Sequence, residues 1–391
     1  MRFIAGPRQS GKTTLAKAHL DAESCSVAYW NWDQRDIKIK HAKGVDLIRE
    51  SRAISPSQKH IQWACFDEIH KMPKWKNILK SYFDAYEDSV RFLITGSARL
   101  DLFRKSGDSL AGRYFLFHLL PLNLFELTRK SEVELEHCVS ASDFIQRRIA
   151  HTRHSDQSTM EALLAYSGFP EPFFHADASF LRLWQRDGLD RLVREDLRDL
   201  TRIAHLENVA TLVTLLPARI GSPLSVNSLR GDLEVSHEAI RNYLDALRLC
   251  YVLFELCVYT KKINRSLKKE RKVYFFDWTR MPDLGKQFEN YVAVELFGWT
   301  MLWSDSGIGT FELQYIKNRK GQECDFLILK NREPWLLIEA KLKDEPLAPH
   351  LYHFASVLGG IPLVQIVKEE GVLHVGKQND YKISASRFLS A

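Results

Sequence analysis

The stretch GPRQSGKT, residues 6–13, decides the fold class of the first part of this chain. It matches G-x-x-x-x-G-K-[ST], the signature of a loop that wraps around phosphate groups. An apolar segment, Arg2–Ala5, comes before it, and KTTLAKAHL, which has a helical pattern, continues from it. A strand, this loop and a helix in that order are the context that the signature requires. The sequence therefore predicts a nucleotide site that begins at Gly6.

Each part of the loop has a predicted role in holding ATP and Mg²⁺. The glycines let backbone N–H groups turn towards phosphates, and the helix N-terminus adds a positive dipole. Lys12 is expected to reach the β- and γ-phosphates, and the Thr13 hydroxyl is expected to bind Mg²⁺. A chance match in a glycine-rich loop is the alternative. The predicted nucleotide-binding residues are Gly6, Pro7, Arg8, Gln9, Ser10, Gly11, Lys12, Thr13 and Thr14.

Two acids follow a second apolar run, in IQWACFDE, residues 61–68. Asp67 stands where a buried strand should end, and it can hold Mg²⁺ through water. Glu68 can polarise the water that attacks the γ-phosphate. A central parallel strand ends at the ligand crevice of its sheet, which favours these roles over two solvated loop acids.

Further strands complete a predicted parallel α/β sheet. Ser26–Asp33 is one of them, and VRFLITGSARL, residues 90–100, is another. The second ends in Thr-Gly-Ser, so Ser97 is a candidate sensor of the γ-phosphate, although these residues also form ordinary turns. Arg113 precedes one more strand and is a candidate arginine finger, with a surface ion pair as the alternative. The chain has no Asn-Lys-x-Asp motif for guanine, which favours ATP.

Residues 126–205 have a helical pattern in which charged and apolar side chains interleave. Gly168, Phe169 and Pro170 predict a helix stop and a turn. A helical lid or linker behind the nucleotide domain is the interpretation, and plain helical packing is the alternative.

Residues 206–280 have the pattern of two helices around a tight turn, followed by two strands. Ser236 is a predicted N-cap, and the helix after it has an apolar face made of Ile240, Leu244, Leu247 and Tyr251. Its outer face carries His237, Arg241, Asn242, Asp245 and Arg248. The link between the strands is basic, with Glu270 as its one acid: Lys261, Lys262, Arg265, Lys268, Lys269, Arg271 and Lys272. This predicts a winged helix that binds DNA phosphates, with a protein-interaction module as the alternative.

The stretch GQECDFLILKNREPWLLIEAK, residues 321–341, is the second pattern with chemical meaning. Two predicted strands, Cys324–Leu329 and Trp335–Lys341, flank a turn. Glu339 and Lys341 are two residues apart and share a face, and the hairpin can bring Asp325 beside them. Two carboxylates on one face can bind Mg²⁺, and a lysine beside them can orient a water or steady a phosphate.

This Asp…Glu-x-Lys arrangement resembles the PD-(D/E)xK nuclease superfamily. The resemblance implies catalysis by Asp325, Glu339 and Lys341, with a metal held by Asp325 and Glu339. Glu289, in the preceding predicted helix, stands where that superfamily often has an additional acidic metal ligand. Surface ion pairs among the same side chains are the alternative. Glu323 is a further acid beside the pattern.

Length and composition agree with these patterns. The chain has 391 residues, 45% hydrophobic and 27% charged, with a net charge of +6 that permits an acidic partner. No apolar run reaches the ~18 residues of a membrane span, and no signal peptide precedes the loop, so we expect a cytoplasmic protein without a membrane partner. Six cysteines without a C-x-x-C pair agree with a reducing compartment: Cys25, Cys65, Cys138, Cys250, Cys257 and Cys324.

Motifs in a fixed order extend the comparison to nearly the whole chain. They include GPRQSGKTTL, YWNWD, DEIHKMPKWKNILK, LITGSARL, SLAGRYFLFHLLPLNLFEL, YSGFPEPF, KVYFFDWTR and GKQFENYVAVEL. They resemble a widespread uncharacterised family of archaeal and bacterial AAA-type ATP-binding proteins. The resemblance implies an ATPase domain joined to a C-terminal domain of unknown function. It also implies a helical segment with adenine contacts ahead of the first strand, which is not seen before Arg2–Ala5 here; either that segment is dispensable or the native start lies upstream.

Together the patterns predict an α/β protein of several domains. We expect a P-loop parallel-sheet ATPase over 1–125, a helical lid or linker over 126–205, a winged-helix-like domain over 206–280 and a restriction-endonuclease-like domain over 281–391. The function hypothesis is ATP hydrolysis with Mg²⁺, coupled to action on DNA or recognition of DNA. The alternative is a nucleotide-switched regulatory protein with a protein partner, whose nuclease-like domain does not cleave. The sequence leaves the oligomeric state open.

Overall fold

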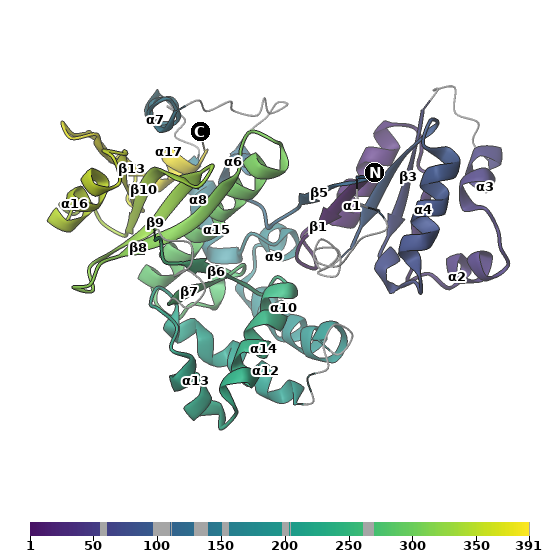
Figure 1. The fold of residues 1–391 in the computed structure, drawn as a ribbon, viewed down its shortest axis with the longest axis horizontal. Coiled ribbons are helices and arrows are strands. Elements are labelled where there is room, and N and C mark those ends of the chain that lie inside the picture. The colour runs from purple at the N-terminus through teal and green to yellow at the C-terminus, as the bar shows by residue number, and fades with distance from the viewer. Residues whose placement is uncertain are drawn as a thin grey trace. The chain divides into compact units, whose positions relative to one another are not determined.

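The computed structural model describes residues 1–54, 61–96, 110, 112–128, 140–150, 156–197, 203, 205–260 and 270–390 (Figure 1). The chain divides into two compact units. Unit 1 is Met1–Leu120 with Leu249–Tyr251, and unit 2 is Pro121–Arg248 with Val252–Ala391.

Unit 1 contains a five-stranded sheet in the order β2-β3-β4-β1-β5. Its strands are β1 (Arg2–Ala5), β2 (Tyr29–Asn31), β3 (Gln62–Asp67), β4 (Val90–Thr95) and β5 (Phe115–His118). All four neighbouring pairs are parallel, which confirms the predicted parallel sheet. The helices of this unit are α1 (Lys12–Ala22), α2 (Arg35–Ala42), α3 (Leu47–Ile54), the short 3₁₀ helix η1 (Ile69–Lys71) and α4 (Trp75–Tyr86).

The apolar strand residues of unit 1 explain why its chemistry lies at one edge. Phe3, Phe66 and Phe92 are almost fully buried in a common core, so β1, β3 and β4 form the centre of the sheet. Because the strands are parallel, their carboxyl ends meet at the same edge. The register pairs Asp67 with Thr95, and Gly6 directly follows β1 at that edge.

Unit 2 begins with helices. They are α6 (Leu124–Thr128), α7 (Ala141–Ala150), α8 (Asp156–Tyr166), α9 (Pro170–His175), α10 (Ala178–Arg191), the π-helical turn η3 (Leu192–Leu197), α12 (Leu206–Leu215), η4 (Leu216–Arg219), α13 (Val226–Leu233) and α14 (His237–Leu249). The predicted stop at Gly168–Pro170 is confirmed, since α8 ends at Tyr166 and α9 begins at Pro170.

The largest sheet of unit 2 among the described residues has six strands in the order β12-β13-β11-β10-β9-β8. They are β8 (Phe311–Lys317), β9 (Glu323–Lys330), β10 (Glu333–Lys341), β11 (Leu363–Val367), β12 (Leu373–Val375) and β13 (Asp380–Ser384). The long helix α15 (Leu284–Asp305) contacts β8, β9 and β10, and α16 (Pro349–Val357) and α17 (Ala385–Ser390) also pack on this sheet. The predicted hairpin at residues 323–341 is confirmed: β9 and β10 are antiparallel neighbours.

The helices predicted as a lid behind the ATPase sheet group with the C-terminal sheet instead. Helices α6, α7 and α8 each contact α17, and α8 also contacts α15. The predicted boundaries after residues 125, 205 and 280 stay predictions, because the chain resolves into two compact units and, apart from Leu249–Tyr251, everything from Pro121 onward falls in unit 2.

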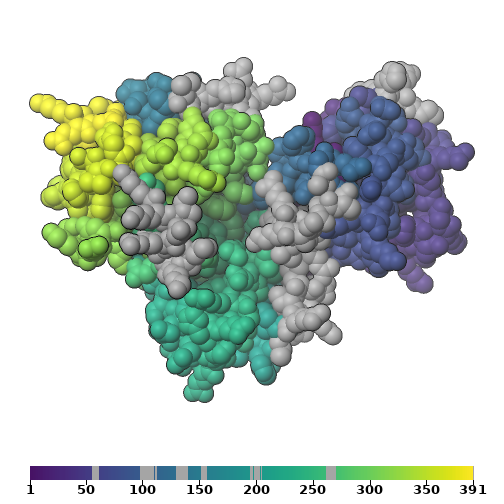
Figure 2. All heavy atoms as spheres, viewed as in Figure 1, coloured from purple at the N-terminus to yellow at the C-terminus, as the bar shows by residue number. Residues whose placement is uncertain are grey.

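The elements expected between residues 206 and 280 are present. The Ser236 hydroxyl accepts a hydrogen bond from the N–H of Ala239, as expected of an N-cap, and the predicted apolar face of α14 is buried. Strands β6 (Leu253–Cys257) and β7 (Arg271–Phe275) pair antiparallel. Helices α12 to α14 lie together (Figure 1), and the teal residues of this part of the chain gather on one area of the unit's surface (Figure 2).

One buried carboxyl group joins the start of unit 2 to its long helix. Glu295 of α15 is 1% exposed and accepts a hydrogen bond of 2.9 Å from the backbone N–H of Leu124. Burial raises the pKa of Glu295 to about 8, because the charged form loses its hydration. Folded protein therefore keeps a proton on this group at a pH where the unfolded chain has released it.

We expect the substitution Glu295→Gln to change how stability depends on pH. The raised pKa of Glu295 stabilises the folded protein, and this contribution is fully present below about pH 4.5 and is lost as the pH rises to about 8. Each unit of pKa shift corresponds to roughly 1.4 kcal/mol. Gln keeps the acceptor oxygen but carries no charge. The free energy of unfolding of the variant, relative to that of the unmodified protein, should therefore increase between pH 5.5 and pH 8. Urea unfolding at both values measures this. The exposed Glu161→Gln on α8 is the control, and equal shifts in both variants would contradict the prediction.

Candidate functional site

The predicted loop residues lie together between the carboxyl end of β1 and the start of α1. Gly6, Gln9 and Gly11 have φ angles of 148°, 62° and 95°, the left-handed region that glycine adopts most easily. The Lys12 ammonium group turns back over the loop and donates a hydrogen bond of 3.0 Å to the carbonyl oxygen of Gly6. The backbone thus has the inward turn that a phosphate-binding loop requires.

The start of α1 is built to receive an anion. Gly11 is the N-cap residue and provides no side-chain cap, so the first N–H groups of the helix have no partner within it. Ser10 is 4% exposed, and its buried hydroxyl has no hydrogen-bond partner in the described part of the chain. A helix N-terminus without a side-chain cap and a buried hydroxyl that lacks a partner both fit phosphate oxygens, so the loop passes this test for a nucleotide.

Asp67 is the most strongly positioned carboxylate of this site. It is 1% exposed at the end of β3, and its Oδ2 atom accepts hydrogen bonds from Thr13 Oγ1 at 2.7 Å and Tyr29 Oη at 2.6 Å. Asn31 Nδ2 donates to the same oxygen at 3.3 Å, and the Thr95 hydroxyl donates to Oδ1. An anionic oxygen next to the Thr13 hydroxyl fits Mg²⁺, which binds through one or two carboxylates and keeps several waters.

Tyr29 and Asn31 were not predicted as site residues. Both lie on β2, two residues apart, so both point to the same face of the strand. The register pairs Asn31 with Asp67, which brings their side chains together. Burial and the bond to Asp67 raise the pKa of Tyr29, so its hydroxyl stays protonated and donates. The signal available in the sequence was the polar i, i+2 pair within the apolar YWNWD stretch.

Glu68 follows Asp67 with a left-handed φ of 55°. Its Oε2 atom lies 3.3 Å from Lys71 Nζ and 3.5 Å from His70 Nε2. Lys71 is itself held by Asp33, whose Oδ2 is 2.7 Å from Nζ. Burial raises the pKa of Glu68, and Lys71 opposes that rise. The group is therefore a partly buried carboxyl group directly after Asp67, held in place by Lys71 and His70.

Two further predicted residues have different outcomes. Ser97 lies outside the described residues. Arg113 lies two residues before β5, and Arg2 pairs with Phe115, so Arg113 is at the amino edge of the sheet, opposite the phosphate loop. Its Nε atom is 3.3 Å from Asp84 Oδ1 of α4. It therefore does not reach the nucleotide site of its own sheet, and a finger role towards another chain stays a prediction.

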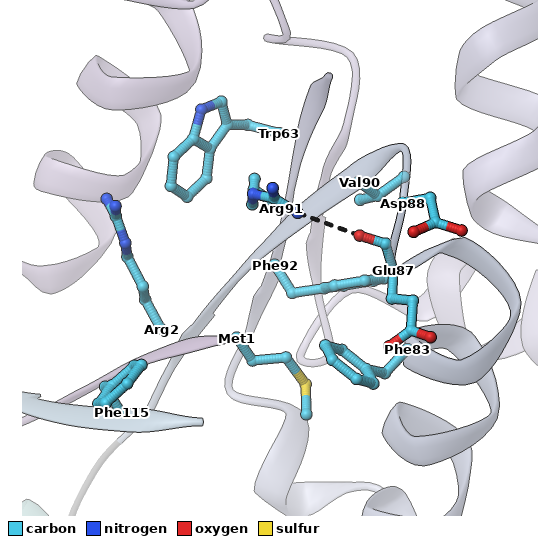
Figure 3. A pocket seen from close by; sticks show the side chains of 10 residues that line it. All are labelled: Met1, Arg2, Trp63, Phe83, Glu87, Asp88, Val90, Arg91, Phe92 and Phe115. Carbon is cyan, nitrogen blue, oxygen red and sulfur yellow. Dashed lines mark hydrogen bonds between the residues drawn. The ribbon is translucent and has the colours of Figure 1, made fainter. Parts of the chain in front are cut away.

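A pocket of about 390 Å³ also lies at this amino edge (Figure 3). Met1, Arg2, Arg91 and Phe115 are among its lining residues, and the Arg91 guanidinium group donates a hydrogen bond of 3.0 Å to the backbone carbonyl of Glu87. None of the predicted nucleotide-binding residues lines it.

The second predicted cluster does assemble in unit 2. The backbone N–H of Asp325 donates to Glu339 Oε2 at 3.3 Å, and Asp325 Oδ2 accepts from the N–H of Ala340 at 3.1 Å. Lys341 Nζ is 2.9 Å from Glu339 Oε1. The prediction that the hairpin brings these three side chains together is therefore confirmed. Burial and the charge of Glu339 raise the pKa of Asp325 to about 7.

Lys272 requires a correction to the predicted basic link. Its side chain is fully buried, and its Nζ atom lies 3.0 Å from Glu323 Oε1, 3.8 Å from Asp325 Oδ1 and 3.9 Å from Glu289 Oε1. The alternation of β7 explains this, because Lys272 and Tyr274 share one face and both contact Glu289.

Arg271 forms an ion pair with Glu255, and residues 261–269, with the other five cations of the link, lie outside the described residues.

The predicted metal set of this cluster does not fit a divalent ion as arranged. Glu289 Oε1 accepts from Tyr274 Oη at 2.7 Å and faces Lys272, so its carboxyl group is already engaged. Burial, followed by the charge of Asp325, raises the pKa of Glu289 to about 7. Within the described ranges, no three histidine, cysteine, aspartate or glutamate side chains gather in a way that could hold a metal. Glu289, Asp325 and Glu339 therefore do not form the three-carboxylate site that the nuclease resemblance implied.

In the part of the chain that the structure covers, no helix combines the length and the apolar character needed to cross a membrane.

Two known domain families match this chain. The AAA domain matches residues 1–128, and a domain of unknown function, DUF8612, matches residues 157–279. The first match contains the loop, Asp67 and Glu68, and the second contains helices α8 to α14 and strands β6 and β7.

Three similar proteins are each described as an uncharacterized protein. The protein MJ1544 of Methanocaldococcus jannaschii is 24% identical over 85% of this chain and 73% of its own length, and MJ1637 of the same organism is 25% identical over 87% and 75%. The protein Rv2008c of Mycobacterium tuberculosis is 24% identical over 75% of this chain and 61% of its own length, so the chain spans less than two thirds of that relative.

Solved structures give weaker likenesses. The Orc1 protein of Aeropyrum pernix, solved in complex with DNA, has a TM-score of 0.32 and 14% identity over 75% of this chain and 86% of its own. The DNA clamp loader delta protein of Bacillus subtilis has a TM-score of 0.27 and 11% identity over 63% and 83%. Both TM-scores are below 0.5, and no functional statement follows from them. From the family matches and the relatives, the chain carries an N-terminal AAA domain followed by DUF8612, and its homologues in archaea and bacteria are uncharacterized.

Proposed function

We propose that this protein binds ATP with Mg²⁺ at the loop of residues 6–14 and hydrolyses it. The observation that carries the proposal is the meeting of Thr13, Asp67 and Glu68 at the carboxyl edge of one parallel sheet, beside a helix N-terminus without a side-chain cap and the buried Ser10 hydroxyl. The match of residues 1–128 to the AAA domain supports it.

Each residue has a distinct task in this proposal. The loop N–H groups and Lys12 bind phosphate oxygens and stabilise the charge that develops on the γ-phosphate. Mg²⁺, when bound, would neutralise charge between the β- and γ-phosphates. Thr13 and Asp67 would hold it, and Tyr29 and Asn31 fix the orientation of Asp67. Glu68 accepts a proton from the attacking water.

ATP turnover by the unmodified protein and by Glu68→Gln tests this proposal. Gln keeps the size of the side chain but cannot accept the proton, so turnover should fall by roughly 10²–10⁴-fold while ATP still binds. Glu87→Gln, an exposed change in the same unit, is the matched control and should keep full turnover. A Glu68→Gln variant that hydrolyses ATP at the original rate would refute the assignment.

We further propose that ATP hydrolysis is coupled to recognition of DNA through α13, α14, β6 and β7, arranged as a winged helix. Exposed Arg241 and Asn242 on the outer face of α14 support this. Asp245, which pairs with Arg248 at 2.8 Å on the same face, weakens it. DNA-stimulated turnover that weakens with added salt is the expected result. Turnover indifferent to DNA would favour the other partner class, a protein.

The C-terminal cluster has two competing roles. Cleavage of DNA by Asp325, Glu339 and Lys341 is supported by their adjacency, and the already engaged oxygen atoms of Asp325 and Glu339 count against the Mg²⁺ that such cleavage would need. A nucleotide-switched regulator with a nuclease-like domain that does not cleave is favoured by one specific observation, the buried ammonium group of Lys272 among the acids. Nicking of DNA by the unmodified protein that is lost in Asp325→Ala would establish the first role. No cleavage of any DNA form would exclude the first role and leave the second as the proposal for this cluster.

A further inference from the structure

The acid centre of unit 2, defined here as Glu289, Glu323, Asp325 and Glu339, contains a buried cation of the chain's own. Lys272 reaches it from β7, while the acids come from α15, β9 and β10. Its side chain has no exposed surface, and three carboxyl groups lie within 4 Å of Nζ. The ring of Tyr315 adds a cation–π contact, with its centroid 5.2 Å from Nζ.

The oxygen atoms that a metal ion would use already face ammonium or N–H groups of the chain, at 2.9–3.8 Å. Asp325 directs Oδ1 towards Lys272, and its Oδ2 accepts from the N–H of Ala340. Glu339 directs Oε1 towards Lys341, and its Oε2 accepts from the N–H of Asp325. Each of the four oxygens of the predicted metal ligands therefore faces an ammonium or an amide group. Mg²⁺ would need several of these oxygens at about 2.0–2.1 Å in octahedral geometry.

Lys272 is held in place from several sides. β7 pairs with β6, where Leu256 is opposite Lys272, and Pro223 bridges to Lys272 on the other side. Gly221 lies so close to Glu289 that an added Cβ atom would be 2.6 Å from Oε2. The three acids around Lys272 raise its pKa against the effect of burial, so the group stays charged.

We propose that Lys272 is the resident cation of the acid centre, and that its ammonium group takes the place of a divalent ion between Asp325, Glu289 and Glu323. The centre then binds no divalent ion while Lys272 is present. Its role in the fold is to join β7 to α15 and β9 by charge, in a domain that needs no metal. This inference does not depend on the proposed ATPase activity, which belongs to unit 1.

Mn²⁺ binding without nucleotide tests the inference. The loss of the free Mn²⁺ signal in electron paramagnetic resonance measures binding to the full chain. The unmodified protein and Asp325→Asn should bind the same amount, since any contribution from unit 1 is common to both. Lys272→Met, which keeps an unbranched side chain of similar length but removes the charge, should bind one additional Mn²⁺ per chain with a dissociation constant of roughly 0.1–1 mM. The double variant Lys272→Met/Asp325→Asn should lose it.

A matched control and a second measurement keep the test decisive. Lys317→Met removes a partly exposed lysine that pairs with Glu270 at 3.1 Å, and it should gain no Mn²⁺. If Lys272→Met lowers the melting temperature, Mn²⁺ should raise it again, because ligands that bind the folded state stabilise it. Asp325-dependent Mn²⁺ binding by the unmodified protein would overturn the inference. So would a Lys272→Met variant that gains neither binding nor thermal stability from Mn²⁺.

Discussion

Substitution of Lys12 by Ala is expected to abolish ATP binding and hydrolysis. Lys12 is 7% exposed, and its ammonium group bonds to the carbonyl oxygen of Gly6 inside the loop. With nucleotide present it is the one side-chain cation of the loop that the motif assigns to the β- and γ-phosphates. Its removal takes away a charge-assisted bond to phosphate. We expect the dissociation constant for ATP to rise at least about 100-fold, which corresponds to roughly 2.8 kcal/mol.

Titration calorimetry with ATP and Mg²⁺ measures this effect, and thermal unfolding separates it from misfolding. Lys12 Nζ donates to the carbonyl oxygens of Gly6 and Pro7. If Lys12→Ala keeps the melting temperature of the unmodified protein, its loss of ATP binding belongs to the missing ammonium group and not to misfolding. Lys38→Ala, an exposed lysine on α2, is the matched control and should bind ATP normally. Undiminished ATP affinity in Lys12→Ala would contradict both the ATPase and the nucleotide-switch proposals.

Local patterns explain what could be predicted from the sequence. The phosphate loop is a contiguous motif, and an apolar run that ends in Asp67 and Glu68 marks the end of a buried strand. Because the strands pair in parallel, the loop and these two acids lie at the same edge of the sheet. Asp325, Glu339 and Lys341 could be grouped because one hairpin contains them, and hairpin register follows from the alternation of side chains.

The features that were missed depend on contacts between distant segments. Tyr29 contacts Asp67 only because β2 pairs with β3, and the sequence YWNWD does not predict which strand lies beside β2. Lys272 ends a run of basic residues, so composition placed it on a solvated link. Its burial depends on β6, α15 and β9, which are separate in sequence. A lysine in a basic run can be buried when acidic side chains from distant segments pack against its face of the strand. Local composition does not show which segments pack there.

Gly6→Ala is expected to disrupt unit 1 more than any surface change. Gly6 has a φ of 148°, and an added Cβ atom would lie 2.1 Å from the carbonyl oxygen of Leu119. The clash is with backbone, so no side chain can rotate away. The N–H of Leu119 donates to the carbonyl of Ala5 at 2.8 Å, directly beside the clash, so relief would pull β5 from β1. We expect a loss of roughly 3 kcal/mol or more, a large part of a typical domain's stability, together with loss of ATP binding.

Gly44→Ala separates the clash from the cost of the backbone angle. Gly44, just past α2, also has a left-handed φ, 72°, but an added Cβ atom would meet nothing within 4 Å. It should cost only about 1 kcal/mol, the ordinary penalty of a non-glycine residue in that conformation. Urea unfolding of both variants, followed by tryptophan fluorescence and by ATP binding, gives the comparison. If Gly6→Ala were no less stable than Gly44→Ala, the close approach of Leu119 to the loop would be wrong, and with it the pairing of β1 with β5 at the phosphate-binding edge.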